Sequence, residues 1–341
     1  MNTPMRIAVV GCGYWGPNLI RNFDALADCV VAKICDADAD RLGKLAARYP
    51  GAEAVTSFDE VVGDDRIEAV AIATPVRTHF PLARACLAAG KHAFVEKPLA
   101  ASTAECRELV ALAEERGVAL MVGHVFLYTA AVRRLKEIVD SGEIGEVLYV
   151  SSQRLNLGLY QRDINVAWDL APHDLSIILY VLGRSPVSVN CQGKAHVSAG
   201  VEDVTVMSLN FSGEAFATIQ SSWLDPSKIR RTTVVGSRKM VVYDDIEPIE
   251  KLKIYDKRVE VPPHYDSFGS FPFSYHYGDM RAPHLKQAEP LRVECQQFLD
   301  CARTGRKSVS CGREGLKVVQ ILEAASRSLG RGGVEVEIAA A

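Results

Sequence analysis

A glycine-rich turn near the amino end limits the fold of this chain more than any other feature. Residues 7–10 form an apolar run typical of a buried strand, and the sequence then reads Gly11-Cys12-Gly13-Tyr14-Trp15-Gly16 before a helical pattern begins. In such a turn Gly11 permits the tight bend, Gly13 lets the backbone approach a pyrophosphate, and Gly16 lets the helix pack against the strand. The free N–H groups and the partial positive charge at the start of the helix favour phosphate binding there.

An acidic residue supports this interpretation. Asp36 follows a second strand-like run, Cys29–Cys35, and lies 20 residues beyond Gly16. A carboxylate at this point accepts hydrogen bonds from a ribose diol and repels a 2′-phosphate. The sequence therefore predicts a dinucleotide-binding fold that prefers NAD to NADP, with Tyr14 and Trp15 as further cofactor contacts. A glycine-rich turn in another kind of α/β protein is the alternative.

Length and composition set the broad class. The 341 residues suffice for about two domains, and the net charge of −3 gives no reason to expect nucleic acid or an anionic membrane as a partner. No apolar run is long enough to cross a membrane, and we expect no signal peptide before the first strand. The nine cysteines are scattered, without C-x-x-C or zinc spacing, so we expect a reduced, cytoplasmic protein without a metal site.

The pattern of strands and helices changes once along the chain. Up to residue 123 they alternate, which predicts a doubly wound parallel sheet in a first domain of residues 1–123. Later, several strand-like runs follow one another without helices between them, which predicts a large, mostly antiparallel open sheet in a second α/β domain of residues 124–341. Because local helices cover one face of such a sheet, another subunit is expected on the other, in a homodimer or homotetramer.

Local signals give further expectations. Capping boxes begin at Ser57 and Ser102, and a helix is expected from about Pro172 to Leu182. Residues 264–284 are rich in aromatic side chains without a regular period, which predicts a long ordered loop. Such a loop would either pack against a neighbouring subunit or contact a sugar or base.

Two polar segments follow apolar runs of the first domain, at the strand ends where doubly wound sheets bind ligands. In Glu96-Lys97-Pro98, the Lys97 ammonium can hydrogen-bond a substrate hydroxyl and stabilise charge on its oxygen, while Glu96 balances Lys97 or touches the cofactor. Thr74 and Pro75 are expected to pack against the cofactor. His79 either contacts the cofactor or is structural, and a solvated turn is the alternative for the segment around Lys97.

A third segment lies in the second domain. Asp169 and His173 are four residues apart, which places both on one face of a helix. Histidine accepts a proton near neutral pH, and a neighbouring carboxylate orients the ring. A helix cap with a surface histidine is the alternative. The polar loop before this segment contributes the candidate substrate contacts Tyr160, Arg162 and Asn165.

These motifs, in this order and spacing, resemble the Gfo/Idh/MocA family of glucose–fructose oxidoreductases and inositol dehydrogenases. The resemblance implies a Rossmann domain followed by an α/β domain whose open sheet commonly forms the oligomer interface. It also implies that Lys97 is the catalytic lysine, Asp169 its acidic partner and His173 the proton-transfer histidine. Many members carry Asn-x-Arg-Phe after the last Rossmann strand. This chain has Gly123-His124-Val125-Phe126 instead, so the role of that arginine is not transferred.

The activity implied by the resemblance is NAD-dependent dehydrogenation of a sugar CH–OH group. Residues 124–128 and 165–174 are similar to a bacterial branch in surface-polysaccharide and sugar-nucleotide pathways. Related members oxidise the 3-hydroxyl of UDP-N-acetylglucosamine-type sugars. The alternatives are a dehydrogenase of a free polyol or monosaccharide such as inositol, a redox-neutral glycoside-cleaving enzyme, and a non-catalytic NAD or sugar sensor.

Overall fold

A computed structural model describes residues 3–158, 160–161, 164–260 and 274–339. The chain forms two compact units: Met1–Thr129 with Ala288–Glu323, and Ala130–Gln287 with Ala324–Ala340. This division differs from a single boundary at residue 123, because Ala288–Glu323 groups with the first unit. Each unit is built around its own sheet.

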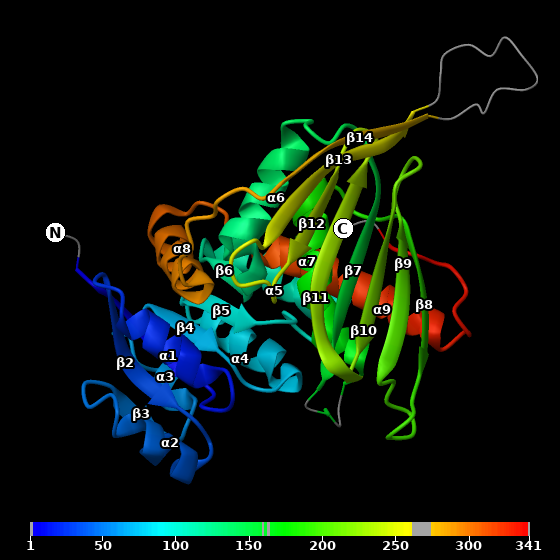
Figure 1. Cartoon of the computed structure of the whole chain (residues 1–341). Helices are drawn as coiled ribbons and strands as arrows, with labels where there is room; N and C mark the ends of the chain where they lie inside the picture. The colour runs from blue at the N-terminus through cyan, green and yellow to red at the C-terminus, as the bar shows by residue number, and fades with distance from the viewer. Residues whose placement is uncertain (1–2, 159, 162–163, 261–273, 340–341) are drawn as a thin grey trace, which may run out of the picture. The chain divides into compact units, whose positions relative to one another are not determined.

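The first unit contains a six-stranded sheet in the order β3-β2-β1-β4-β5-β6, with every pair parallel (Figure 1). The predicted doubly wound parallel sheet is therefore confirmed. The order reverses between β1 and β4, and a doubly wound sheet binds ligands beside this point, outside the carboxyl ends of its strands. The strands are β1 (Met5–Val10), β2 (Cys29–Cys35), β3 (Glu53–Val55), β4 (Ala69–Ile72), β5 (His92–Glu96) and β6 (Leu120–Gly123). The helices are α1 (Gly16–Asp24), α2 (Ala39–Ala46), α3 (Asp59–Val62), α4 (Val76–Ala88), α5 (Thr103–Arg116), the 3₁₀ helix η1 (Val125–Tyr128), α8 (Pro290–Thr304) and the first part of α9 (Gly312–Leu329).

A cluster of three phenylalanines explains why the late helix α8 belongs to the first unit. Phe298 of α8 lies 5.7 Å from Phe94 of β5 and 6.2 Å from Phe23 of α1 between ring centroids, in edge-on arrangements. All three side chains are fully buried. Aromatic pairs of this geometry contribute about 0.5–1.5 kcal/mol each beyond the area they bury. This packing joins α8 to segments 204 and 275 residues earlier in the sequence.

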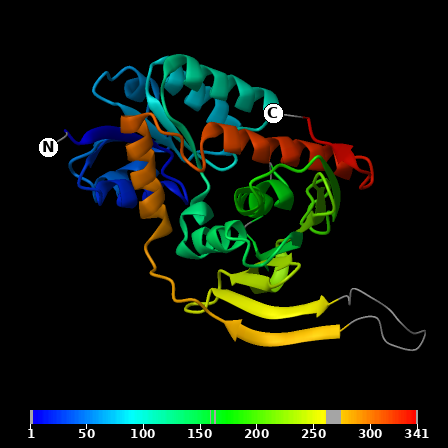
Figure 2. The ribbon, with the colours of Figure 1, turned by 90° about the horizontal axis from the view of Figure 1, so that it is seen from above.

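The second unit contains a nine-stranded sheet in the order β14-β13-β12-β11-β7-β10-β9-β8-β15. Among the described strands of this sheet, only β7 and β10 pair in parallel, so the expected mostly antiparallel sheet is confirmed. Figure 2 shows β13 and β14 as a yellow and orange ribbon. The strands are β7 (Val147–Leu157), β8 (Ser188–Lys194), β9 (Val204–Asn210), β10 (Phe216–Ser222), β11 (Leu224–Gly236), β12 (Met240–Asp244), β13 (Leu252–Glu260), β14 (Ser274–Arg281) and β15 (Val336–Glu337).

Helices α6 (Ala130–Asp140) and α7 (Val166–Leu182) pack against this sheet, and a buried ion pair fixes α7 there. Asp174 of α7 accepts hydrogen bonds from Arg154 Nε at 2.7 Å and from the Ser152 hydroxyl at 2.7 Å, both on β7. Breaking such a buried pair costs about 3–5 kcal/mol. On the opposite face, Tyr149 and Phe216 stack on one another and remain partly exposed.

The structure confirms one of the expectations about where helices begin and contradicts two. The Ser102 hydroxyl does cap α5, accepting the Glu105 N–H at 3.2 Å. The box at Ser57 is wrong: Phe58 is the N-cap of α3 and makes no side-chain cap bond. Helix α7 begins at Val166, not near Pro172, because the Asn165 side chain caps it by accepting the Trp168 N–H at 3.2 Å.

The aromatic segment 264–284 is not a loop throughout. Its residues Ser274–Arg281 form β14, which pairs with β13. Residues 264–273 lie outside the described part of the chain. In the described ranges, no helix combines the length and apolar character needed to cross a membrane.

Candidate functional site

The glycine turn has the shape that a dinucleotide requires. Gly11 adopts a φ of +95°, and a Cβ on it would lie 2.6 Å from the carbonyl oxygen of Ala73. A Cβ on Gly16 would lie 1.8 Å from the carbonyl oxygen of Gly11. Gly13 differs, because no atom lies within 4 Å of the position its Cβ would take. Gly11 and Gly16 are therefore required by the turn itself, while Gly13 leaves room for a pyrophosphate.

Asp36 is held beside this turn by the backbone. Its Oδ2 accepts the N–H of Cys12 at 2.6 Å, and its Oδ1 accepts the N–H of Asp38 at 2.9 Å. A guanidinium nitrogen of Arg41 lies 3.4 Å from Oδ2. A carboxylate has about four acceptor positions, so lone pairs remain for a ribose diol. The fold thus joins two segments 24 residues apart into one ribose and pyrophosphate cradle.

The two aromatic residues of the turn lie in different environments. The Tyr14 side chain is 82% exposed, whereas Trp15 is half-buried. The rings are roughly parallel, with centroids 6.4 Å apart. Both remain candidates for cofactor contact. The Trp15 indole lies close enough to Glu96 to favour the ionised carboxylate and lower its pKa.

His79 connects the ends of two strands. Its Nδ1 lies 2.8 Å from the carbonyl oxygen of Pro98, and its Nε2 lies 2.8 Å from that of Thr74. The ring is buried, and burial lowers its pKa. Because both nitrogens face backbone carbonyls, the geometry favours the structural alternative over a polar contact with the cofactor. Thr74 and the exposed Pro75 lie at the carboxyl end of β4, and the Thr74 methyl group approaches Gly11.

Glu96 and Lys97 follow β5 at the same edge of the sheet. The Glu96 carboxylate lies against the backbone of Gly123, where a Cβ would be 2.8 Å from Glu96 Oε2. Burial raises the pKa of Glu96 to about 7, against the opposing effect of the Lys97 charge. His124 comes directly after β6 and is buried. Burial and the Lys97 charge together lower the pKa of its imidazole to about 3. This edge therefore combines a carboxyl group, an ammonium group and a neutral imidazole.

The second unit contributes the Asp169 and His173 pair on α7. Both side chains are half-buried, and their four-residue spacing puts them on one face of the helix. Asp169 Oδ2 accepts a hydrogen bond from the Trp223 indole N–H at 3.1 Å. Tyr160 packs on Trp223 with ring centroids 5.1 Å apart. Sequence reasoning missed Trp223, because a tryptophan at the end of a strand gives no sign of the side chain it will meet.

The other expected substrate contacts differ in the groups that they contact in the structure. Asn165 uses its oxygen to cap α7 and its nitrogen to bond Glu202 at 2.9 Å, so its polar atoms are engaged in structure. Tyr160 donates from its hydroxyl to Asp203 at 3.3 Å. Arg162 lies outside the described residues.

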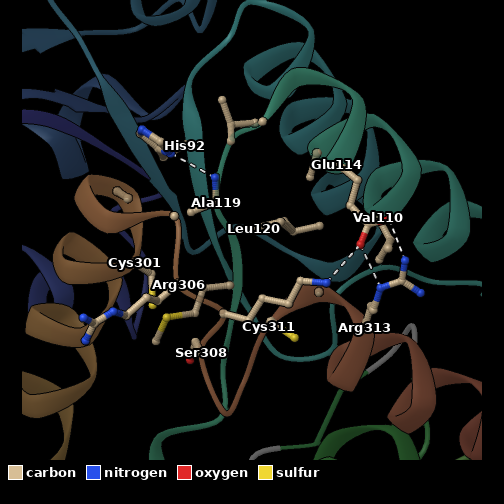
Figure 3. A pocket seen from close by; sticks show the side chains of 18 residues that line it. His92, Val110, Glu114, Ala119, Leu120, Cys301, Arg306, Ser308, Cys311 and Arg313 are labelled. Carbon is tan, nitrogen blue, oxygen red and sulfur yellow. Dashed lines mark hydrogen bonds and ion pairs between the residues drawn. The ribbon is translucent and has the colours of Figure 1, made fainter.

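A cavity of about 390 Å³ lies at the other edge of the first sheet (Figure 3). His92 and Leu120, which begin β5 and β6, form part of its wall. Glu114 holds Arg313 at 2.6 Å and Lys307 at 3.4 Å on its rim. This cavity is at the amino ends of the strands, so it is separate from the ligand edge with Lys97.

The described residues contain no group of three or more His, Cys, Asp or Glu side chains arranged to hold a metal ion. The glycine turn, the start of α1 and Asp36 fit the pyrophosphate and one ribose of NAD. In the first unit, Lys97 supplies an ammonium group, which can donate a hydrogen bond to an oxygen atom. In the second unit, His173 supplies an imidazole, which can accept a proton near neutral pH.

Family models match both units. A model of the oxidoreductase family with an NAD-binding Rossmann fold, Gfo/Idh/MocA, matches residues 5–124, and a model of the C-terminal domain of this family matches residues 132–242. The first unit is therefore an NAD-binding Rossmann domain.

Curated relatives and solved structures agree with these models. UDP-N-acetylglucosamine 3-dehydrogenase from Acidithiobacillus ferrooxidans is 32% identical over 208 residues, which cover 60% of this chain and 64% of that enzyme. Myo-inositol 2-dehydrogenase from Thermotoga maritima is 27% identical, with 71% and 76% covered. The structure of GenD2 from gentamicin A biosynthesis, solved with NAD, has a TM-score of 0.84 at 27% identity and covers 100% of this chain and 98% of its own. The chain belongs to the Gfo/Idh/MocA family of NAD-dependent oxidoreductases.

Proposed function

We propose that this protein oxidises a sugar hydroxyl, at C3 of a UDP-N-acetylglucosamine-type nucleotide sugar, in surface-polysaccharide or sugar-nucleotide biosynthesis. The observation that carries the proposal is the set of proton-handling groups: Lys97 at the ligand edge of the Rossmann unit, and the Asp169 and His173 pair on α7. A non-catalytic sensor has no need of such a set. NAD, when bound, supplies the acceptor for the hydride.

Each residue has a separate role in this proposal. His173 accepts the hydroxyl proton, as an imidazole can near neutral pH. Lys97 donates a hydrogen bond to the same oxygen and stabilises its developing negative charge. Asp169, itself held by Trp223, orients the imidazole or a neighbouring sugar hydroxyl. Tyr160 and Arg162 are proposed to contact the sugar or the nucleotide.

Two substrate classes have support among the relatives. The Acidithiobacillus ferrooxidans relative, named for UDP-N-acetylglucosamine, also matches in structure at 25% identity and a TM-score of 0.79 over 97% of this chain. The Thermotoga maritima relative is named for myo-inositol, which keeps a free polyol as the second candidate. Residues 124–128 and 165–174 favour the nucleotide sugar, by their resemblance to that branch.

A substrate screen tests the proposal. Purified protein with NAD is offered UDP-N-acetylglucosamine, other UDP- and dTDP-sugars, myo-inositol and glucose, and NADH absorbance is recorded. We expect NADH with a UDP-sugar, with a 3-keto product identified by mass spectrometry after deuteride reduction. A His173→Asn variant is the control for background reduction. Activity with inositol alone would make a free polyol, and not a nucleotide sugar, the substrate of this protein. NAD binding without any turnover would favour a non-catalytic sensor.

We propose in addition that a second copy of this chain covers the open face of the nine-stranded sheet. Tyr149 and Phe216 stack there at 5.7 Å between ring centroids, with 38% and 43% of each residue exposed. Val206 lies on the same face and is 49% exposed. Exposed apolar side chains on one face of a sheet are typical of a protein interface.

A further inference from the structure

A buried carboxyl group in the Rossmann unit has no role in the mechanism above. Glu294 of α8 has no exposed surface, and neither carboxyl oxygen has a hydrogen-bond partner among the described residues. A polar group buried in this way destabilises a protein unless something satisfies it. A leucine in place of Glu294 would avoid the free-energy cost of burying the carboxyl group, so the presence of a glutamate here suggests that the carboxyl group has a role.

The phenylalanine cluster shows what Glu294 faces. Phe298 of α8 packs on Phe94 of β5 with ring centroids 5.7 Å apart. Glu294 is four residues before Phe298 and so lies on the same face of the helix, one turn earlier. Glu96 is two residues after Phe94 and so lies on the same face of the sheet. The two carboxyl groups therefore lie in the same part of the unit, near enough for the charge of Glu96 to act on Glu294. Glu96 Oε1 is also buried without a hydrogen-bond partner among the described residues.

The charges around the two groups differ. Burial raises the pKa of Glu294 far above its ordinary value, and the negative charge of Glu96 raises it further. The nearby Lys97 charge instead lowers the pKa of Glu96. The other titratable groups that face this region, His124, Tyr128 and Cys295, all have pKa values shifted by burial toward their neutral forms. Lys97 thus favours negative charge on Glu96, and nothing described favours it on Glu294.

We propose that Glu96 and Glu294 share one proton, with Glu294 as the neutral acid that donates a hydrogen bond, through an internal water molecule, to the Glu96 carboxylate. The pair then holds a single negative charge beside the Lys97 ammonium. Glu294 is a positioning residue in this arrangement, because it acts on Lys97 only through Glu96. Its effect on catalysis depends on the proposed function of Lys97, whereas the shared proton does not.

Infrared spectroscopy of the full-length protein tests the shared proton without any substrate. A protonated carboxyl group absorbs above the amide I band, and the band shifts in D₂O. At pH 7 the wild-type minus Glu294→Gln difference spectrum should contain one such band. The matched control is Glu289→Gln at the start of the same helix, where Arg21 pairs with the carboxylate and lowers its pKa, so its difference spectrum should contain none. A wild-type minus Glu294→Gln difference spectrum without the band would mean that Glu294 is ionised in the wild type and would overturn the proposal.

Chemical labelling of Lys97 tests the consequence. Acetic anhydride reacts with free amines, and peptide mass spectrometry gives the rate at Lys97 relative to the exposed Lys44. In Glu294→Leu, Glu96 loses the hydrogen bond proposed to come from Glu294 and takes up a proton more readily, so the relative rate at Lys97 should rise about fivefold to tenfold at neutral pH. In Glu294→Gln the amide still donates to Glu96, so the rate should match wild type.

Packing changes alone give a different result. Cys295→Ala removes a buried side chain from the same turn of α8 and leaves both carboxyl groups in place, so the labelling rate at Lys97 should not change. Circular dichroism establishes that each variant is folded. Equal rates in Glu294→Leu and wild type, or equal increases in the leucine and glutamine variants, would refute the role of Glu294 as a hydrogen-bond donor. Neither measurement depends on which sugar the enzyme oxidises.

Discussion

Trp223 donates its indole N–H to the Asp169 carboxylate at 3.1 Å, across 54 residues of sequence. A hydrogen bond to a charged group contributes about 1.5–3 kcal/mol. If Asp169 orients His173, Trp223→Phe should lower kcat about 10-fold to 100-fold with a small change in KM. Steady-state kinetics with the sugar found in the screen measures this effect. Equal kcat values in the variant and wild type would show that Asp169 keeps its orientation without Trp223.

Lys97 is expected to act on the substrate oxygen rather than on the cofactor. Lys97→Ala should therefore reduce kcat by at least about 100-fold, the usual effect of losing one such donor. NAD affinity, measured by calorimetry on the same sample, should stay within a few-fold of wild type. Lys44→Ala, on the exposed surface of α2, is the control. A large loss of NAD affinity would assign Lys97 to cofactor binding instead.

Cofactor preference should depend on Asp36. In Asp36→Ser the repulsion of a 2′-phosphate is lost, while Arg41, 3.4 Å from the carboxylate in wild type, remains to attract it. The ratio of kcat/KM for NAD to that for NADP should fall by about 10-fold or more, because the carboxylate no longer repels the 2′-phosphate of NADP and Arg41 can form an ion pair with it. Asp38→Ser keeps a capping side chain on α2 and should leave the ratio unchanged. An unaltered ratio in Asp36→Ser would remove the argument for its role.

Acid should destabilise the protein through His124. Its pKa is lowered to about 3 by burial and by Lys97, against about 6.5 in the unfolded chain. The unfolded state therefore binds more protons between these values, and stability falls as pH decreases below 6.5. Between pH 6.5 and pH 5 this contribution is about 2 kcal/mol. Urea unfolding at both pH values measures the free energy of unfolding. Its decrease from pH 6.5 to pH 5 should be smaller by this amount in His124→Leu than in wild type, and equal decreases in the two proteins would contradict the prediction.

Subunit association should depend on the open face of the second sheet. Phe216→Glu places a charge beside Tyr149, so it should dissociate the proposed oligomer. Sedimentation velocity measures the change. Ile249→Glu alters an apolar residue that is 75% exposed and lies outside the strands, and it should leave the oligomer intact. A wild-type protein that sediments as a monomer at micromolar concentration would exclude the interface.

Much of the fold followed from local patterns. The strand, glycine turn and helix around Gly11, and the parallel sheet to which they belong, were predicted because a nucleotide-binding turn needs glycine at fixed positions. The spacing of Asp169 and His173 put them on one helical face whether the helix began at Pro172 or, as found, at Val166. Side-chain engagement was not predictable in this way. Asn165 is a helix cap and the two ring nitrogens of His79 face backbone carbonyls, although both residue types also occur at ligand sites.

The sequence alone determined the family, the cofactor-binding turn and the two kinds of sheet, since these depend on residue types at short, fixed separations. Only the tertiary structure decided that residues 288–323 complete the Rossmann unit, that Trp223 meets Asp169, and that Glu294 is buried near Glu96. The physical reason is that burial and hydrogen bonding depend on which distant segments pack together. The surroundings of Glu294 depend on where Phe298, four residues later on the same helix, packs, and no local pattern in the sequence predicts that position.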